Sequence, residues 1–277
     1  MADGMTPEQV LRWYITAGVD AVVQETPVDR YAAPARAAEQ PSRRQAQQQQ
    51  PQAAPAREAA AQPAEQPGVA PTAAQARQQA PHVQDIHTIA ELRQALDAFD
   101  ACPLKATAST TVVGDGDPTT PLMLVGEAPG ADEDRQGLPF VGRAGGLLDR
   151  MLAAIGRDRS SCYISNILPW RPPGNRQPTT QEVAMLLPFA ERHIELVDPA
   201  VLVFLGGTSA KALLARKEGI MKLRGRWHNY ATPGLPRPVP AMATFHPAYL
   251  LRNPGQKRLA WRDLLAVEAR LADTTTD

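Results

Sequence analysis

The chain has 277 residues, with 29 basic and 29 acidic side chains, so its formal net charge at pH 7 is zero. A balanced charge excludes binding to nucleic acid through overall charge alone and leaves only a local basic face for that purpose. The two cysteines exclude a disulfide framework, and no apolar run approaches the roughly 20 residues that a membrane span needs. Because no signal-peptide pattern is present either, we expect a cytoplasmic protein without membrane contact.

The first predicted element is a helix over 6–25, within a predicted N-terminal segment of residues 1–30. Thr6 and Pro7 provide a cap and a proline at the first helical position, and apolar residues then recur at helical spacing. Residues 31–85 are rich in Ala, Pro and Gln and hold few large apolar side chains to offset the entropy of ordering. We expect a disordered linker there, and a helix that either docks on the rest of the chain or recruits a protein partner.

Helix and strand patterns alternate over the predicted domain of residues 86–277. The predicted strands are continuously apolar, which is typical of a sheet that is covered on both faces. The pattern predicts an α/β fold, a three-layer α/β/α sandwich around a mainly parallel four-stranded sheet. The predicted strands are 122–125, 162–167, 201–205 and 240–245, and the predicted helices are 88–99, 142–155, 180–197, 209–215 and 256–271.

The most informative motif is the run LMLVGEAPGADEDRQGLPFVGRAGG over 122–146. Glu127 stands at the carboxyl end of a predicted strand, where open α/β sheets bind their ligands. Phe140 returns in the following loop, so a carboxylate and a flat apolar ring can face one another. Such a pair suits a planar, uncharged heterocycle.

This run resembles the first signature of the family 4 uracil-DNA glycosylases, a GEAPG-type turn followed by a PFVGRAG-type segment. Two further segments match in the same order, SNILPWRPPGNRQPT over 165–179 and FHPAYLLRN over 245–253. Three ordered motifs are far more specific than one glycine-rich turn. The resemblance covers about residues 100–272. It implies a monomeric DNA repair enzyme that hydrolyses uracil from DNA and leaves an abasic site.

The resemblance also implies a role for the residues near the strand ends. Glu127 would position or activate the attacking water, in a loop where Gly126 and Gly130 permit close backbone approach to the substrate. Asn166 would read the uracil edge, because one amide can donate to a carbonyl and accept from a ring N–H. From the residues alone, Glu127 can instead cap the following turn, and Asn166 can form a turn.

Two aromatic side chains complete the predicted site. Phe140 would stack on the flipped base, which favours binding without choosing among bases. His246 would donate to a uracil carbonyl oxygen as negative charge develops there, and a neutral imidazole N–H suffices for this purpose.

DNA contacts are predicted at helix starts and in the segment after His246. Backbone N–H groups at a helix start can bind phosphate, and apolar side chains can fill the gap left by an extruded base, unless they pack within their helix. A local basic face is also predicted between 216 and 262, where Glu218 is the one acid. The predicted DNA-contacting residues are Arg143, Gly207, Ser209, Leu250, Leu251 and Arg252.

Members of this family usually hold a [4Fe–4S] cluster through four cysteines, and this chain departs from that pattern. Cys102 stands at one ligand position, whereas Phe99 and Trp170 stand at two others and residues 186–187 offer no cysteine at the fourth. Cys162 lies inside a predicted strand. Because a cluster needs about four thiolates, we expect no iron–sulfur cluster and no other metal or cofactor, with apolar packing in its place.

Two other functions fit the same sequence. A broader deaminated-base glycosylase would also remove hypoxanthine or xanthine, and a non-catalytic protein of the same fold would bind lesions without releasing a base. Crosslinking relatives carry an inserted KRRIH-type loop with an extra reactive histidine, and the segment after Asn166 has no such histidine.

Overall fold

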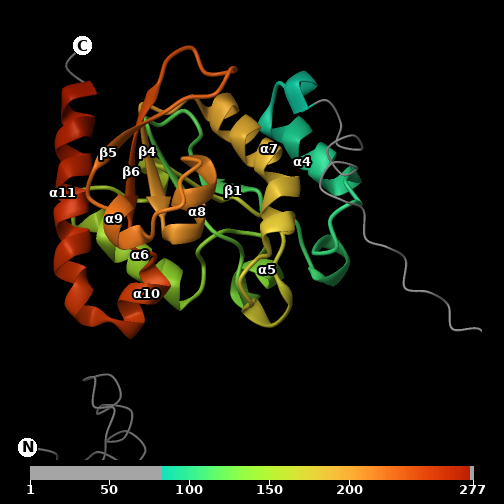
Figure 1. Ribbon diagram of the computed structural model, residues 1–277, viewed down its shortest axis with the longest axis horizontal. Coiled ribbons are helices and arrows are strands. Elements are labelled where there is room, and N and C mark those ends of the chain that lie inside the picture. The colour runs from blue at the N-terminus through green and yellow to red at the C-terminus, as the bar shows by residue number, and fades with distance from the viewer. Residues whose placement is uncertain (1–82, 275–277) are drawn as a thin grey trace, which may run out of the picture. The chain divides into compact units, whose positions relative to one another are not determined.

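The structure, a computed structural model, describes residues 83–274 (Figure 1). The predicted helix over 6–25 and the predicted linker as far as residue 82 lie outside the described residues. The last residues of the predicted linker range, Val83–Asp85, form a 3₁₀ turn, and the adjacent Ile86 is buried. Within the described residues, no helix is both long enough and apolar enough to cross a membrane.

A six-stranded mixed sheet forms the centre of the fold, in the order β1-β3-β2-β4-β6-β5. The four inner strands β3, β2, β4 and β6 run parallel, and the edge strands β1 and β5 are antiparallel to their neighbours. The strands are β1 Gly114–Gly116, β2 Leu122–Gly126, β3 Tyr163–Asn166, β4 Val201–Leu205, β5 Trp227–Tyr230 and β6 Val239–Thr244.

The predicted sheet of four strands is therefore wrong in strand number, although the four inner strands lie within one residue of their predicted ends. The two additional strands give no apolar run. Strand β1 has the sequence GDG, and two of the four residues of β5 are exposed. Edge strands pair on one side only, so they lack the continuous apolar signature of covered strands.

Helices pack against both faces of the sheet. Side chains alternate along β4, so that Leu202 and Phe204 join one apolar core with α4, α7 and α8, while Val203 joins a second core with α6 and α11. Figure 1 shows α4 and α7 on one side of the strands and α11 on the other. The helices are α4 Ile89–Ala98, α5 Ala131–Gln136, α6 Arg143–Ala153, α7 Thr180–Val197, α8 Gly207–Leu213, α9 Ile220–Leu223, α10 Pro247–Arg252 and α11 Lys257–Thr274.

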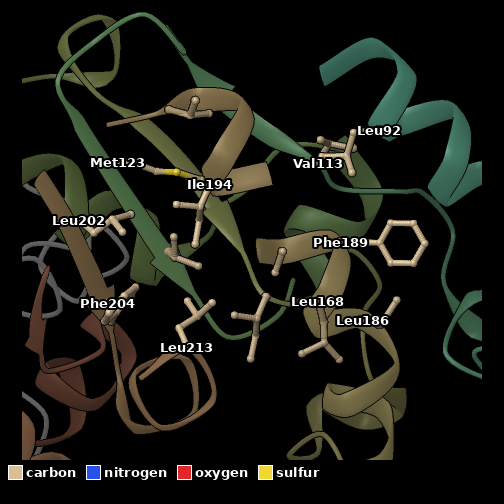
Figure 2. Close-up of a cluster of buried hydrophobic side chains, with 14 of the residues drawn as sticks. Leu92, Val113, Met123, Leu168, Leu186, Phe189, Ile194, Leu202, Phe204 and Leu213 are labelled. Atoms are coloured by element: carbon tan, nitrogen blue, oxygen red, sulfur yellow. The ribbon is translucent and has the colours of Figure 1, made fainter. Parts of the chain in front are cut away.

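The core on the α7 face is the larger of the two, and Figure 2 shows part of it. Helix α7 starts at a capping box, in which Thr179 Oγ1 accepts from Glu182 N and Glu182 Oε2 accepts from Thr179 N. The buried side of α7 then carries Leu186 and Phe189 into this core. The short helices α5, α9 and α10 were not predicted, because six residues or fewer show no clear helical period.

Trp170 is the largest fully buried side chain of the described residues and lies in the α7-face core. We expect Trp170→Ala to lower the free energy of unfolding by about 3–5 kcal/mol, because a large cavity replaces the indole. The measurement is urea unfolding followed by circular dichroism. Trp227→Ala is the matched control, since Trp227 is 38% exposed on an edge strand and should cost roughly 1 kcal/mol. Equal losses from the two variants would contradict the placement of Trp170.

Candidate active site

The predicted site residues gather at one edge of the sheet, because the four parallel strands all end there. Gly126 ends β2 directly opposite Asn166, which ends β3. Strand β4 is followed by Gly206, and β6 is followed by Phe245 and His246. The hydrogen bond from Gly206 N to the Thr244 carbonyl, 2.9 Å long, ties the last two strand ends together.

Phe140 and Asn166 both pack directly against Gly126. A Cβ atom placed on Gly126 would overlap Asn166 Oδ1 and would lie 2.6 Å from Phe140 Cζ, so no side chain can be accommodated there. Asn166 Oδ1 is buried and has no hydrogen-bond partner among the described residues. A buried polar atom of this kind normally has a partner. The unpaired amide therefore marks the place where a ligand N–H fits.

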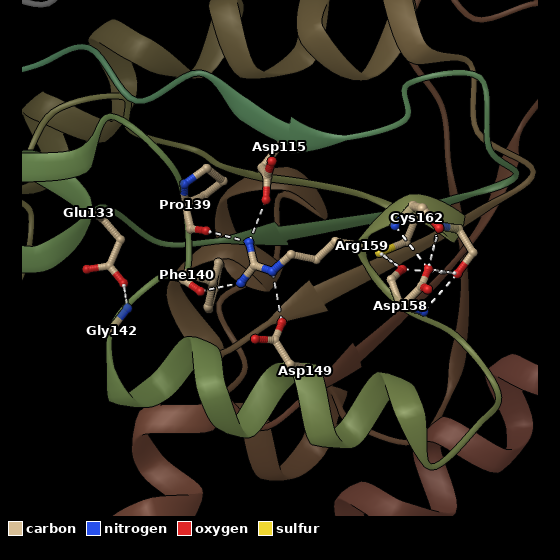
Figure 3. Close-up of polar contacts among 11 residues, drawn as sticks. Asp115, Glu133, Pro139, Phe140, Gly142, Asp149, Asp158, Arg159 and Cys162 are labelled. Carbon is tan, nitrogen blue, oxygen red and sulfur yellow. Dashed lines mark hydrogen bonds and ion pairs between the residues drawn. The ribbon is translucent and has the colours of Figure 1, made fainter.

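Phe140 is held in a strained backbone conformation. Its φ of 54° lies in the left-handed region, which costs a non-glycine residue about 1–3 kcal/mol. The guanidinium of Arg159 donates to the carbonyl oxygens of Phe140 and of Pro139, the latter at 3.1 Å (Figure 3). Hydrogen bonds from a charged donor are worth about 1.5–3 kcal/mol each, which is enough to offset the strain.

The Glu133 carboxylate also holds this loop, through hydrogen bonds to backbone N–H groups. Glu133 Oε1 accepts from Gly142 N at 2.9 Å, as Figure 3 shows, and its Oε2 accepts from Gly130 N at 3.1 Å. One buried carboxylate thus joins the starts of α5 and α6. The Phe140 carbonyl also approaches Gly145 so closely that a Cβ there would overlap it.

His246 is prepared to act as a neutral hydrogen-bond donor. Its Nδ1 accepts from Ala248 N at 3.1 Å, so the proton of the neutral ring is on Nε2. Burial, and then the nearby Arg252 charge, lower the pKa of His246 to about 4. The ring lies 5.5 Å from that of Phe140, centroid to centroid, at an angle of 30°. The predicted base-stacking and base-polarising side chains are therefore neighbours.

A buried ion pair supports the segment before His246. Arg224, which belongs to the predicted basic face, instead pairs with Asp263 of α11 and lies 5.2 Å from the centroid of the Phe245 ring. Asp263 Oδ2 also accepts from Thr244 Oγ1 at 2.6 Å. Arg224 therefore fixes the end of β6 and is not part of a DNA-binding surface.

Glu127 follows Gly126 directly and is partly buried. Its carbonyl accepts from Leu168 N at 3.1 Å, which continues the pairing of β2 and β3 beyond the strands. No hydrogen bond or ion pair of its carboxylate is found among residues 83–274. The carboxylate is therefore available at the same sheet edge as Asn166.

The predicted DNA-contacting residues divide into exposed and buried groups. Arg143, at the start of α6, and Arg252, at the end of α10, are exposed, and Leu251 is partly exposed. Leu250 is 1% exposed and packs in a small core with Leu147 of α6. Leu250 therefore holds α10 in place, and of the two leucines only Leu251 offers surface to DNA.

The helix start at Gly207 presents its backbone rather than side chains. Gly207 is partly buried at the first position of α8. Ser209 is fully buried, and its hydroxyl donates to the Gly206 carbonyl at 3.3 Å. A contact of Ser209 with phosphate is thus restricted to its backbone.

The positions at which the resemblance implies cluster ligands lie together in the α7-face core. Phe99, Cys102 and Trp170 are buried there; of the two candidates for the fourth position, Leu186 is buried and Leu187 is partly buried against the same core. The Phe99 ring lies 5.2 Å from that of Phe189. One thiol among three apolar side chains does not fit a cluster of four thiolates. Cys162 belongs to the core on the opposite face, and no group of three or more His, Cys, Asp or Glu residues forms a metal site within the described part of the chain.

Two residues that organise the site were not predicted from the sequence. Glu133 could have been found, because its spacing of three from Gly130 matches an N-cap and an acid at the third helical position. Arg159 carries no local signal, because its partners Pro139 and Phe140 lie 20 and 19 residues away in the chain.

These residues define a class of protein, an α/β enzyme that binds a flat heterocycle at the carboxyl edge of its sheet. The chain belongs to the uracil DNA glycosylase superfamily, whose family model matches residues 113–265. It is 43% identical to the type-4 uracil-DNA glycosylase of Thermotoga maritima over 154 residues, which are 55% of this chain and 78% of the relative. The type-4 uracil-DNA glycosylase of Pyrobaculum aerophilum is 36% identical over 178 residues, 63% of this chain and 90% of the relative.

Two buried imidazoles should make the protein less stable in acid. Burial lowers the pKa of His193 to about 4, and the pKa of His246 is also about 4, both below the ordinary value of 6.5. Between pH 6.5 and 4 the unfolded chain binds protons that the folded protein does not, so stability falls as the pH is lowered through that window.

We expect His246→Gln to reduce this pH dependence, measured as the urea unfolding free energy at pH 7.5, 5.5 and 4.5. Each such histidine contributes a slope of at most about 1.4 kcal/mol per pH unit. His87→Gln, at an exposed histidine, is the control and should leave the slope unchanged. An unaltered slope in His246→Gln would show that His246 is already protonated in the folded protein at pH 5.5.

Proposed function

We propose that this protein hydrolyses the N-glycosidic bond of uracil in DNA, with the Asn166 amide as the group that reads the base. The buried, unpaired Oδ1 of Asn166 carries this proposal. A buried acceptor without a partner costs about 1–3 kcal/mol, and a ligand N–H removes that cost. Uracil offers an N–H at ring position 3. Cytosine has none there and would leave the amide oxygen unpaired, so the site rejects it.

His246 acts on the leaving base. As the glycosidic bond breaks, the base departs as an anion, and negative charge develops on its carbonyl oxygens. The Nε2–H of His246 is the free donor of that ring, since Nδ1 is occupied by Ala248 N. A preorganised donor of this kind is worth about 2.7–4 kcal/mol in a site that excludes water. The low pKa keeps the imidazole neutral, so it stabilises the anion by hydrogen bonding alone.

Glu127 acts on the sugar side. The sugar takes on oxocarbenium character in the transition state, so a nearby carboxylate stabilises its positive charge and orients the attacking water. Glu127 directly follows Gly126, which pairs with Asn166, and this position supports the proposed role. Its lack of a hydrogen-bond partner among the described residues leaves both oxygens for the substrate.

Base flipping requires groups that bind the distorted DNA. A uracil must leave the stack to reach Asn166, which costs a few kcal/mol and leaves a gap in the strand. Leu251 has the exposed apolar surface to fill that gap, and Arg252 beside it can reach a phosphate. Arg143, at the start of α6, can contact a second phosphate near the loop that carries Phe140.

The base-reading role of Asn166 is tested by Asn166→Asp. We expect single-turnover release of uracil from a single-stranded oligonucleotide to fall by about 10- to 100-fold, because the carboxylate cannot donate to a uracil carbonyl. Release is measured as alkali-labile strand cleavage, with cytosine and hypoxanthine oligonucleotides assayed in parallel.

Asn229→Asp makes the same change at an exposed asparagine of β5 and should leave the rate within about twofold of wild type. Unchanged uracil release by Asn166→Asp would remove this residue from the proposed role. No release by the wild-type protein from single- or double-stranded substrate would leave a lesion-binding protein as the better function.

We also infer that apolar packing replaces the iron–sulfur cluster in this protein. The side chains at the ligand positions support this proposal, because Phe99 and Trp170 are buried with Cys102 in one core and Leu187 packs against it. The Trp170 indole N–H also donates to Thr111 Oγ1 at 3.2 Å. Packing of this kind joins the same chain segments that a cluster would join.

The protein purified without oxygen should therefore be colourless and should contain no stoichiometric iron or sulfide. Metal analysis and the absorption spectrum near about 400 nm, where clusters absorb, provide the measurement. Cys102→Ser should retain uracil release, since the thiol acts only as a small buried side chain. One cluster per chain would overturn the proposal and would require ligands other than these four residues.

A further inference from the structure

The orientation of Phe140 depends on contacts outside the base-binding residues. Its left-handed backbone turns the ring towards Gly126 and His246 and turns its carbonyl the opposite way, towards α6 and Arg159. Gly126 and Gly145 lie against Phe140 with backbone atoms alone, because neither position has room for a Cβ atom. Among the described residues, the Arg159 guanidinium is the side chain that donates to the carbonyl of Phe140.

Arg159 is itself fixed by two carboxylates from different elements. Its Nη1 donates to Asp115 Oδ2 of β1 at 2.6 Å, and its Nε donates to Asp149 Oδ1 of α6 at 2.9 Å. Figure 3 shows the guanidinium between these two carboxylates, facing the Pro139 and Phe140 carbonyls. All three guanidinium nitrogens donate hydrogen bonds, so the guanidinium plane is held in one orientation. A lysine cannot reproduce it, because an ammonium lacks the planar array of donors.

We propose that Arg159 is a positioning residue for uracil release, which acts by holding Phe140 in the orientation that stacks on the flipped base. The proposal rests on the glycosylase function given above. A purely structural alternative is that Arg159 only joins β1 to α6 through Asp115 and Asp149. The two differ in one respect: only the positioning role makes the effect of Arg159 on catalysis depend on the Phe140 ring.

A double-mutant cycle tests this dependence with Arg159→Lys, Phe140→Ala and the combined variant. Single-turnover release of uracil from a single-stranded oligonucleotide is measured well below the melting temperature of every variant. We expect each single substitution to slow release by about tenfold or more, and the combined variant to match Phe140→Ala within about twofold. If the two rate losses multiply, Arg159 acts independently of Phe140 and the proposal fails.

Arg192→Lys is the matched control. Arg192 is also partly buried, donates to the Ile86 carbonyl and pairs with Glu195, all away from the sheet edge that carries Asn166. It should lower the melting temperature without changing the rate of release per folded molecule. If Arg159→Lys behaves in the same way as Arg192→Lys, its role is structural only.

Asp149→Asn provides a second test, which holds even if Arg159→Lys does not fold. Asp149 is 48% exposed and holds only one edge of the guanidinium. We expect its loss to slow release by a few-fold in the wild-type background and not at all in the Phe140→Ala background. Equal slowing in both backgrounds would overturn the proposal. An inactive wild-type protein would instead count against the glycosylase function, so the two failures are distinguishable.

Discussion

The active-site edge depends on the absence of a side chain at Gly126. The parallel pairing of β2 and β3 places Gly126 opposite Asn166, and the Phe140 ring lies over the same point. The space that a single Cβ would fill is what allows both the amide and the ring to pack against Gly126. Glu133 and Arg159 then hold the loop that carries the ring from its outer side. Gly126 leaves room for the amide and the ring, and Glu133 and Arg159 hold the loop that carries the ring.

Strain and burial are concentrated at the groups that we propose to meet the base. Phe140 is held in a left-handed conformation, Asn166 Oδ1 is buried without a partner, and His246 is neutral because it is desolvated. The first two conditions cost free energy in the protein without substrate, and each of the three removes a reorganisation step when a base arrives. The folded scaffold offsets these costs through burial in the two apolar cores.

Sequence patterns predict features that neighbouring residues determine, but they do not reveal contacts between residues that are far apart in the chain. The four inner strands are apolar throughout, so their limits could be predicted, whereas β1 and β5 are polar edge strands without a signature. Glu127, Asn166 and His246 could be placed at one edge because parallel strands end together. The pairing of Arg224 with Asp263, 39 residues apart, left no trace in the sequence. In the six-residue helix α10, no periodicity distinguished the buried Leu250 from Leu251.

The two faces of the sheet meet in the short segment that follows Asn166. Phe140 belongs to the core on the α6 face, while Trp170 belongs to the core on the α7 face. Between them, Ile167 N and Leu168 N donate to the carbonyls of Gly126 and Glu127, at 3.0 and 3.1 Å. These backbone hydrogen bonds fasten the segment that follows Asn166 to Gly126 and Glu127, and Trp170 anchors the far end of the segment. If apolar packing replaces a cluster, as proposed above, the Trp170 indole is the buried anchor of this segment.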